Sequence, residues 1–252
     1  NMNSQSTLLN SIFFPRPSFI SRDDKDHLVE VDKNTEVGVR FFLSDKNFSN
    51  ILFFHGNAEL AQEYNDIAEY YNTTGCNFIV ADYRGYGLSK GTPNKENLHS
   101  DSQKIFRYVQ SFLTNNGYDS KMIIMGRSLG SASACEIIAS NENKIDGCII
   151  ESGFATEIPL MNILGIVPSE INYDPKDGFE NLKKIKSYTK PILIIHSEND
   201  DIIPLSEARV IYESVKSKNK KIWIIENANH NNIMMYAKMN YFKKIKSFID
   251  NI

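Results

Sequence analysis

Short apolar runs and amphipathic stretches alternate along most of the chain, which predicts alternating strands and helices. Continuous apolar runs such as 50–54 are typical of strands buried on both faces of a parallel sheet. The expected strands are 27–31, 37–43, 50–54, 76–81, 121–125, 145–151, 191–196 and 221–226. The expected helices are 59–73, 95–115, 128–140, 205–217 and 232–249. An initial hairpin followed by strand–helix units predicts an α/β fold, with a mostly parallel sheet of about eight strands and helices on both faces.

Two segments depart from this alternation. Residues 8–20 contain Pro15 and Pro17, so we expect them to run extended along the body rather than form a helix. Residues 154–188 are rich in glycine and proline, which suggests short helices and turns. An insertion there would lie over the carboxyl ends of the strands, where ligands bind in open α/β sheets, so we interpret it as a small cap rather than a long loop. We expect residues 1–252 to form one domain that carries this cap.

Composition narrows the classes of protein. A chain of 252 residues, 41% of them hydrophobic, can bury one large core. Its net charge of −3 gives no general attraction to nucleic acid. There is no apolar run of 18 residues, so we expect no integral membrane segment. Residues 1–10 also lack the basic start and apolar core of a secretory signal.

The three cysteines, Cys76, Cys135 and Cys148, are an odd number without metal-type spacing. We expect free thiols that pack as small apolar residues in a reducing compartment, which favours a cytoplasmic location. The chain also lacks a glycine-rich phosphate loop, so no metal or other cofactor is expected. Basic clusters at 218–221 and 243–246 allow peripheral contact with acidic lipids, but their spacing around apolar residues fits solvated faces better.

A Gly-x-Ser-x-Gly sequence joins the expected strand at 121–125 to the helix that follows. It comprises Gly126, Ser128 and Gly130 with one residue between each pair. A sharp strand–turn–helix of this form holds a nucleophilic serine in a strained backbone conformation, which only small flanking residues tolerate. A serine that merely N-caps its helix is the alternative.

A serine hydroxyl needs a base that takes its proton, and there are five histidines. His230 is the strongest candidate because it sits in a polar loop between the last strand and the last helix, at the edge of the sheet that also carries Ser128. We expect packing or surface roles for His27 and His99. His196 is a plausible structural hydrogen-bonding residue, and His55 braces its own loop.

The base needs a carboxylate that orients it, and Glu198, Asp200 and Asp201 follow the strand at 191–196. Asp200 is favoured because it stands four residues before Pro204, which leaves it on the exposed turn of the loop. Asp201 is the second choice, with capping of the next helix as its alternative role.

Ester chemistry also needs backbone N–H groups that stabilise an oxyanion. In a strand–turn–helix of this kind, the first donor is the backbone N–H of the residue after the nucleophilic serine, here Leu129. The second is expected in the loop after the third strand, where Gly56 permits close backbone approach and the N–H of Asn57 can point inward.

With these features, the chain from about Phe41 to its C-terminus resembles the α/β-hydrolases. It resembles in particular their protein depalmitoylase (acyl-protein thioesterase)-like branch. The matching stretches are 55–59, 82–91, 126–130, 196–200 with Ile203 and Pro204, and 228–231. In the second stretch, Asp82 and Arg84 are expected to tie loops together. The chain departs from the family pattern at Ser197 and Asn229, where glycine is usual; asparagine tolerates positive φ. That branch carries an acylated N-terminal cysteine cluster, and this chain has no cysteine before Cys76.

The sequence therefore predicts a serine hydrolase that cleaves an ester or thioester of a small-molecule or acyl-protein substrate through an acyl-enzyme. Ser128, Asp200 and His230 form the expected triad, and the amides of Asn57 and Leu129 the oxyanion hole. Two alternatives stay open. One is a serine aminopeptidase or amidase with the same triad, and the other is a non-catalytic binding scaffold with this fold. The oligomeric state is left open by the sequence.

Overall fold

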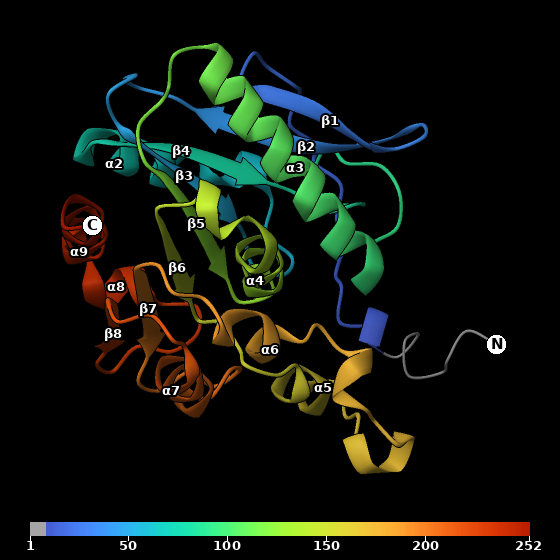
Figure 1. The fold of residues 1–252 in the computed structure, drawn as a ribbon. Coiled ribbons are helices and arrows are strands. Elements are labelled where there is room, and N and C mark those ends of the chain that lie inside the picture. Colours follow the sequence, from blue (N-terminus) through green and yellow to red (C-terminus); the bar gives the residue numbers. More distant parts are fainter. Residues whose placement is uncertain (1–8) are drawn as a thin grey trace.

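One eight-stranded sheet runs through the structure, a computed structural model that describes residues 9–252 (Figure 1). The strands follow the order β1-β2-β4-β3-β5-β6-β7-β8. The strands β1 (Asp26–Asp32) and β2 (Thr35–Phe42) form an antiparallel hairpin, β2 pairs antiparallel with β4, and all other neighbours pair in parallel. The remaining strands are β3 (Ser49–Phe54), β4 (Cys76–Ala81), β5 (Met122–Arg127), β6 (Gly147–Glu151), β7 (Ile192–Ser197) and β8 (Lys220–Ile225). The predicted mostly parallel sheet of about eight strands is confirmed.

Helices cover both faces of the sheet (Figure 1). One face carries α3 (Lys95–Asn115), α4 (Gly130–Asn141), α6 (Asn181–Lys186) and α7 (Leu205–Ser214), and the other carries α2 (Asn65–Thr74) and α9 (Met239–Asp250). The side chains of β3 alternate between the two cores: Leu52 and Phe54 pack on the α3–α4 side, and Ile51 and Phe53 on the α2–α9 side. Full burial of one such side chain contributes about 1.5–3 kcal/mol. Burial on both faces is the physical reason why these strands are apolar throughout.

Two expected helices differ from the prediction in more than their terminal residues. The helix expected at 59–73 begins as a 3₁₀ turn, η1 (Ala61–Tyr64), and the Ala61 N–H donates to the buried Asp82 carboxylate at 3.0 Å. The prediction of a single helix at 232–249 is wrong. The chain forms α8 (Ile233–Ala237) and α9, separated by Lys238 at φ 50°. A residue in this left-handed region cannot continue a right-handed helix, so the two helices run in different directions.

The N-terminal segment is only partly extended. Leu9 and Asn10 are helical, so the expectation of an extended chain is wrong there; the prolines that motivated it restrict only their own neighbourhood. From Phe13 onward the segment has no helix, and Pro17 bridges to Gly87. Residue 8, which the prediction also covered, lies outside the described residues.

Residues 154–188 form short helices and turns, as expected. They comprise α5 (Ile158–Ile163), η3 (Pro168–Ile171), η4 (Pro175–Asp177) and α6. The last of these packs against α4. The interpretation as a cap on a single domain stays a prediction.

All three cysteines are buried, in agreement with their expected packing role. Burial raises the pKa of Cys76 to about 11 and that of Cys135 to about 12, so both thiols stay protonated near neutral pH. Within residues 9–252, no helix combines the length and the apolar character needed to cross a bilayer.

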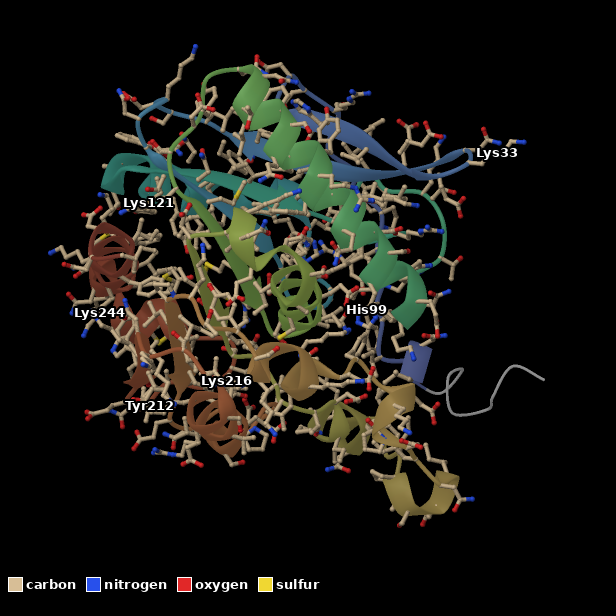
Figure 2. The ribbon with its side chains drawn as sticks, viewed as in Figure 1. Lys33, His99, Lys121, Tyr212, Lys216 and Lys244 are labelled. Atoms are coloured by element: carbon tan, nitrogen blue, oxygen red, sulfur yellow. The ribbon has the colours of Figure 1, made fainter. Side chains whose placement is uncertain are left out.

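His99 links α3 to α6 on the α4 side of the sheet (Figure 2). The Lys184 ammonium lies 3.1 Å from His99 Nε2, and it also reaches the Phe179 carbonyl and the Glu136 carboxylate. An ammonium can only donate, so His99 Nε2 must accept and the imidazole is neutral. Burial, together with the Lys184 charge, lowers the pKa of His99 to about 4.

This neutral histidine makes stability depend on pH. As the pH falls from about 6.5 to 4, the unfolded chain binds a proton at His99 that the folded chain does not, so the free energy of unfolding decreases. The loss attributable to this residue reaches roughly 3 kcal/mol at about 1.4 kcal/mol per pKa unit. His99→Gln keeps an acceptor for Lys184 without the titration, so urea unfolding between pH 7 and pH 4.5 should show a shallower loss in the variant. Parallel curves for both proteins would contradict this account.

Candidate active site

Ser128 occupies a strained turn between β5 and α4. Its φ is 51°, a conformation that is rare and costly for a residue with a side chain. A Cβ atom on Gly126 would lie 2.3 Å from the Gly130 carbonyl oxygen, and one on Gly130 would lie 1.9 Å from the Phe54 carbonyl oxygen. The turn therefore closes only with glycine at both positions. The helix expected from Ser128 begins at Gly130 with Leu129 as its N-cap, so Ser128 is not a helix cap.

His230 faces Ser128 from the loop between β8 and α8. Its Nε2 lies 3.1 Å from the Ser128 Oγ, and both side chains are buried. β5 and β8 belong to the parallel part of the sheet, so the loops after them emerge at the same edge. The structure thus brings together two residues that are 102 positions apart in sequence.

Asp200 completes the chain of hydrogen bonds. Its Oδ2 lies 2.8 Å from His230 Nδ1, and its Oδ1 accepts from the N–H groups of Ile202 and Ile203 at 3.0 and 2.7 Å. Burial raises the pKa of Asp200, but the hydrogen bonds from His230 and the two amides outweigh it and the pKa is lowered. The carboxylate is therefore ionised at neutral pH, so His230 Nδ1–H donates to it and Nε2 is left to accept from Ser128.

The turn that carries Asp200 is exposed at Glu198, Asn199 and Asp201, but the Asp200 side chain itself is 0% exposed. The two N–H groups that follow it fold the carboxylate inward, against the sheet edge. Asp201 points to solvent instead. Glu198 is also exposed, and its carboxylate accepts from the Asn227 N–H at 2.9 Å.

The remaining histidines have structural environments, as expected. The His27 ring packs against Phe41 and Phe112. The buried His196 has its Nε2 2.8 Å from the Ile203 carbonyl oxygen, on the loop that carries Asp200. His55 braces its own loop through Nδ1, which lies 2.7 Å from the Gly56 carbonyl oxygen.

The expected loop ties after β4 are also present. The second His55 nitrogen, Nε2, lies 2.6 Å from an oxygen of the buried Asp82 carboxylate. Arg84 donates to both carboxylate oxygens of Asp101 on α3, at 2.8 and 2.9 Å.

The amides of Asn57 and Leu129 are the expected oxyanion donors. Among residues 9–252, neither backbone N–H has a hydrogen-bond acceptor. Two other segments hold the loop that carries Asn57. The Asn57 side-chain oxygen accepts from the Phe14 N–H at 3.0 Å and from the Tyr86 hydroxyl at 2.6 Å. No local sequence pattern predicts this contact with the N-terminal segment, because it joins residues 43 positions apart.

A pocket of about 260 Å³ opens beside Ser128. Asn57 and His230 also line it, as do Glu59, Arg127 and Asn231. Most of its other walls are apolar, from the N-terminal segment, α5 and the Asp200 loop, and they consist of Ile12, Phe14, Leu160, Ile163, Leu164 and Ile202. Sequence reasoning missed Ile12 and Phe14.

The two residues that depart from the family pattern, Ser197 and Asn229, contact each other. The Ser197 hydroxyl donates to the Asn229 carbonyl oxygen at 2.7 Å, which ties the Asp200 loop to the His230 loop. Positive φ in the latter occurs at Asn227, at 65°, and not at Asn229.

Metal ligation has no support in the described part of the chain. Across residues 9–252, no group of three or more His, Cys, Asp or Glu side chains could hold a metal ion.

Comparison with protein families agrees with this geometry. The family model described as serine aminopeptidase, S33 matches residues 45–170, which is half of the chain. The chain belongs to this α/β-hydrolase family. The matched range contains β3, the loop with Asn57 and the turn with Ser128. It ends before Asp200 and His230.

Individual proteins extend the similarity over more of the chain. The alpha/beta hydrolase domain-containing protein 17C of Mus musculus is 31% identical over 204 residues, which cover 80% of this chain and 59% of that protein. The chain thus spans less than two thirds of that relative. The human protein 17B is 27% identical over 226 residues, or 88% of this chain and 74% of its own length. The predicted membership of the α/β-hydrolases is confirmed by these matches.

Solved structures show the same fold at low identity. An esterase of Pyrococcus furiosus superposes with a TM-score of 0.74 at 17% identity, and the alignment covers 94% of this chain and 98% of the esterase. At this identity the likeness concerns the fold alone.

Proposed function

We propose that the protein is a serine hydrolase that cleaves a carboxylic ester or thioester of an acyl group through an acyl-enzyme. The observation that carries the proposal is the hydrogen-bonded series Asp200–His230–Ser128, which ends at a pocket with largely apolar walls. Membership of the α/β-hydrolases supports it.

In the first half of the reaction, Ser128 Oγ attacks the acyl carbonyl carbon while its proton passes to His230 Nε2. The carbonyl π electrons move to oxygen and form a tetrahedral intermediate. When that intermediate collapses, the bond to the leaving oxygen or sulfur breaks, and His230 gives its proton to the leaving group. An acyl ester of Ser128 remains.

In the second half, water takes the place of Ser128. His230 removes a proton from water, hydroxide adds to the acyl carbon, and the Ser128–acyl bond breaks as His230 returns the proton to Oγ. The products are a carboxylic acid and the free serine. Asp200 keeps its negative charge throughout and stabilises the imidazolium that forms twice in each cycle.

The amides of Leu129 and Asn57 stabilise the two tetrahedral oxyanions in this proposal. Removal of one such donor costs about 2.7–4 kcal/mol of transition-state stabilisation in comparable sites. Both amides belong to rigid backbone, at the start of α4 and in the loop braced by His55 and Tyr86, so they need little reorganisation when the negative charge develops.

The pocket walls favour an acyl chain as the occupant. Leu160 and Ile163 come from α5 and Leu164 follows it, which supports the interpretation of residues 154–188 as a small cap on a single domain. The substrate is then a small-molecule acyl ester or an acylated protein, with its chain between the cap and Ile12 and Phe14.

Amide hydrolysis is the second candidate, since the matching family model is described as serine aminopeptidase. The same three side chains can cleave an amide when the nitrogen is protonated on departure. Initial rates on matched octanoyl ester, octanoyl thioester and aminoacyl amide substrates separate the two candidates. We expect the ester and thioester to be cleaved faster.

Replacement of the candidate nucleophile tests the proposal directly. Ser128→Ala should reduce hydrolysis of a p-nitrophenyl ester by at least about 10⁴-fold, because it removes the hydroxyl that His230 Nε2 contacts. Labelling by a fluorophosphonate probe should disappear as well. Far-ultraviolet circular dichroism should be unchanged, because the side chain loses one hydroxyl only. Equal labelling of both proteins would contradict the proposal, and an unlabelled wild type that turns over no ester would favour the non-catalytic scaffold.

The adjacent aspartates provide a matched pair for the orienting acid. Asp200→Asn should lower kcat by about 10³–10⁴-fold, because a neutral amide no longer holds His230 in the required tautomer. Asp201→Asn makes the same chemical change one residue away at an exposed site, so its kcat should stay close to that of the wild type. The reverse order would show that the acid has been misassigned.

A further inference from the structure

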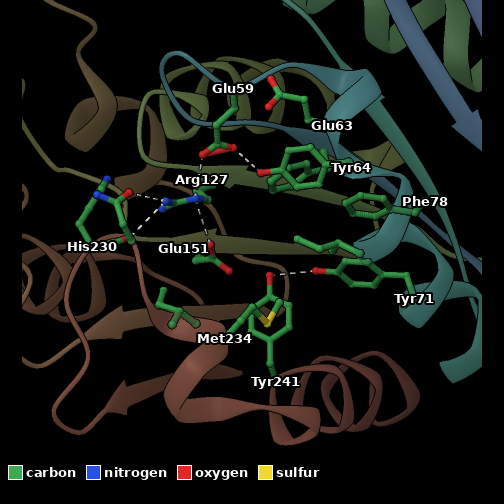
Figure 3. A pocket seen from close by; sticks show the side chains of 14 residues that line it. Glu59, Glu63, Tyr64, Tyr71, Phe78, Arg127, Glu151, His230, Met234 and Tyr241 are labelled. Atoms are coloured by element: carbon green, nitrogen blue, oxygen red, sulfur yellow. Dashed lines mark hydrogen bonds and ion pairs between the residues drawn. The ribbon is translucent and has the colours of Figure 1, made fainter. Parts of the chain in front are cut away.

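Arg127, the residue before Ser128, touches two loops of the site at once (Figure 3). Its Nε lies 3.1 Å from Glu59 Oε1, in the loop that carries Asn57. Its Nη2 donates to the His230 carbonyl oxygen at 3.1 Å and to the Asn231 side-chain oxygen at 3.3 Å. One guanidinium therefore spans the loop of the oxyanion donor and the loop of the base.

The two acids beside Arg127 are themselves attached to the site. Glu59 Oε2 accepts from the Gly56 N–H at 3.2 Å and from the Tyr64 hydroxyl, so it fixes the backbone just before Asn57. Glu151 lies at the end of β6 with its Oε2 3.7 Å from Arg127 Nε. The Glu151 main-chain oxygen accepts from the Ser128 N–H at 2.9 Å.

Burial makes this network rigid. The side chains of Arg127 and Glu151 are 14% and 6% exposed. Burial lowers the pKa of Arg127, but Glu59 and Glu151 outweigh it and the pKa is raised, so the guanidinium stays charged. Its planar fork serves Glu59 and the His230 loop in fixed directions, which a single ammonium on a flexible stem cannot do.

We infer that Arg127 is a positioning residue, which holds the His230 loop and the Asn57 loop at the distances from Ser128 that acyl transfer requires. This inference rests on the proposed serine hydrolase function. Arg127 is not a member of the hydrogen-bonded series Asp200–His230–Ser128. It acts on His230 through the His230 main-chain carbonyl. Displacement of a reacting group by about 1 Å can cost about 100-fold in rate, so a loosened loop would appear mainly in kcat.

Arg127 lines the pocket beside Ser128, and a second cavity reaches it from another side. The second cavity has a volume of about 290 Å³ and lies among Arg127, Glu151, Tyr64, Met234 and Tyr241, as Figure 3 shows. Arg127 Nη1 and Glu151 Oε1 are buried without a hydrogen-bond partner in the described part of the chain. A small planar cation that enters this cavity can therefore reach the space that a shortened residue 127 would leave.

The first test compares two arginines. Arg127→Lys keeps a positive charge for Glu59 and Glu151 but removes the fork. Arg84→Lys is the matched control, since its side chain is also 14% exposed and its bidentate pair with Asp101 lies outside the proposed machinery. On a p-nitrophenyl ester we expect kcat of Arg127→Lys to fall by about 10–100-fold with KM nearly unchanged. The control should keep the wild-type kcat, even if its melting temperature falls as much.

The second test is chemical rescue. In Arg127→Ala, guanidinium chloride at non-denaturing millimolar concentration should restore kcat by at least about tenfold, and the same concentration of sodium chloride should not. Circular dichroism first establishes that this variant is folded; if it is not, Arg127→Lys alone decides.

The outcomes separate the two proposals. Wild-type protein that neither hydrolyses esters nor reacts with a fluorophosphonate overturns the proposed function. Active wild-type protein together with an Arg127→Lys variant whose kcat equals that of Arg84→Lys overturns the positioning role alone. Equal response of Arg127→Ala to guanidinium chloride and sodium chloride also overturns it.

Discussion

The close approach of α4 to the end of β3 is the constraint on which the candidate site depends. A methyl group on Gly130 would collide with the Phe54 carbonyl oxygen, so the first turn of α4 lies directly against the β3 backbone. Asn57 follows Phe54 by three residues, and Leu129 precedes Gly130. The same contact therefore accompanies the strained turn at Ser128, and it joins the chain segments that carry the Asn57 and Leu129 amides. Strain of this kind persists only where the surrounding structure over-determines it, and here the parallel pairing of β3 with β5 does so.

Charge is arranged around this turn in two groups. In one, a lone carboxylate, Asp200, is held by two amides and faces the imidazole of His230. In the other, Arg127 stands between Glu59 and Glu151 and reaches the main chain of the same histidine. In the proposed mechanism the first group stabilises the protonated form of His230, whereas the second contacts the main chain of the loop that carries it. A site built in this way separates proton transfer from positioning, which is why substitutions in the two groups have different expected signatures.

Local sequence patterns predicted the parts of the fold that depend on local physics. β4 and α3 begin and end at the predicted residues, because a short apolar run and an amphipathic stretch are both local features of the sequence. The break at Lys238 was missed because neither glycine nor proline marks it. The helix expected at Glu59 starts later, in a turn where the Ala61 amide meets the distant Asp82 carboxylate. Loop position and chain order predicted Ser128, Asp200 and His230. The burial of the Asp200 side chain, the pocket wall formed by Ile12 and Phe14, and the Arg127 network depend instead on contacts between segments far apart in sequence. No periodicity reports such contacts.

In the proposed mechanism, acyl transfer passes through an ester on Ser128, and the mass of the protein during turnover should reveal that ester. A p-nitrophenyl octanoate reaction should be quenched in acid after a few milliseconds and digested, because an activated leaving group makes acylation fast relative to hydrolysis of the acyl-enzyme. The account predicts an octanoyl group on the peptide that contains Ser128, and fragmentation should locate it at that residue. Ester turnover with an acyl group on any other residue would contradict the account.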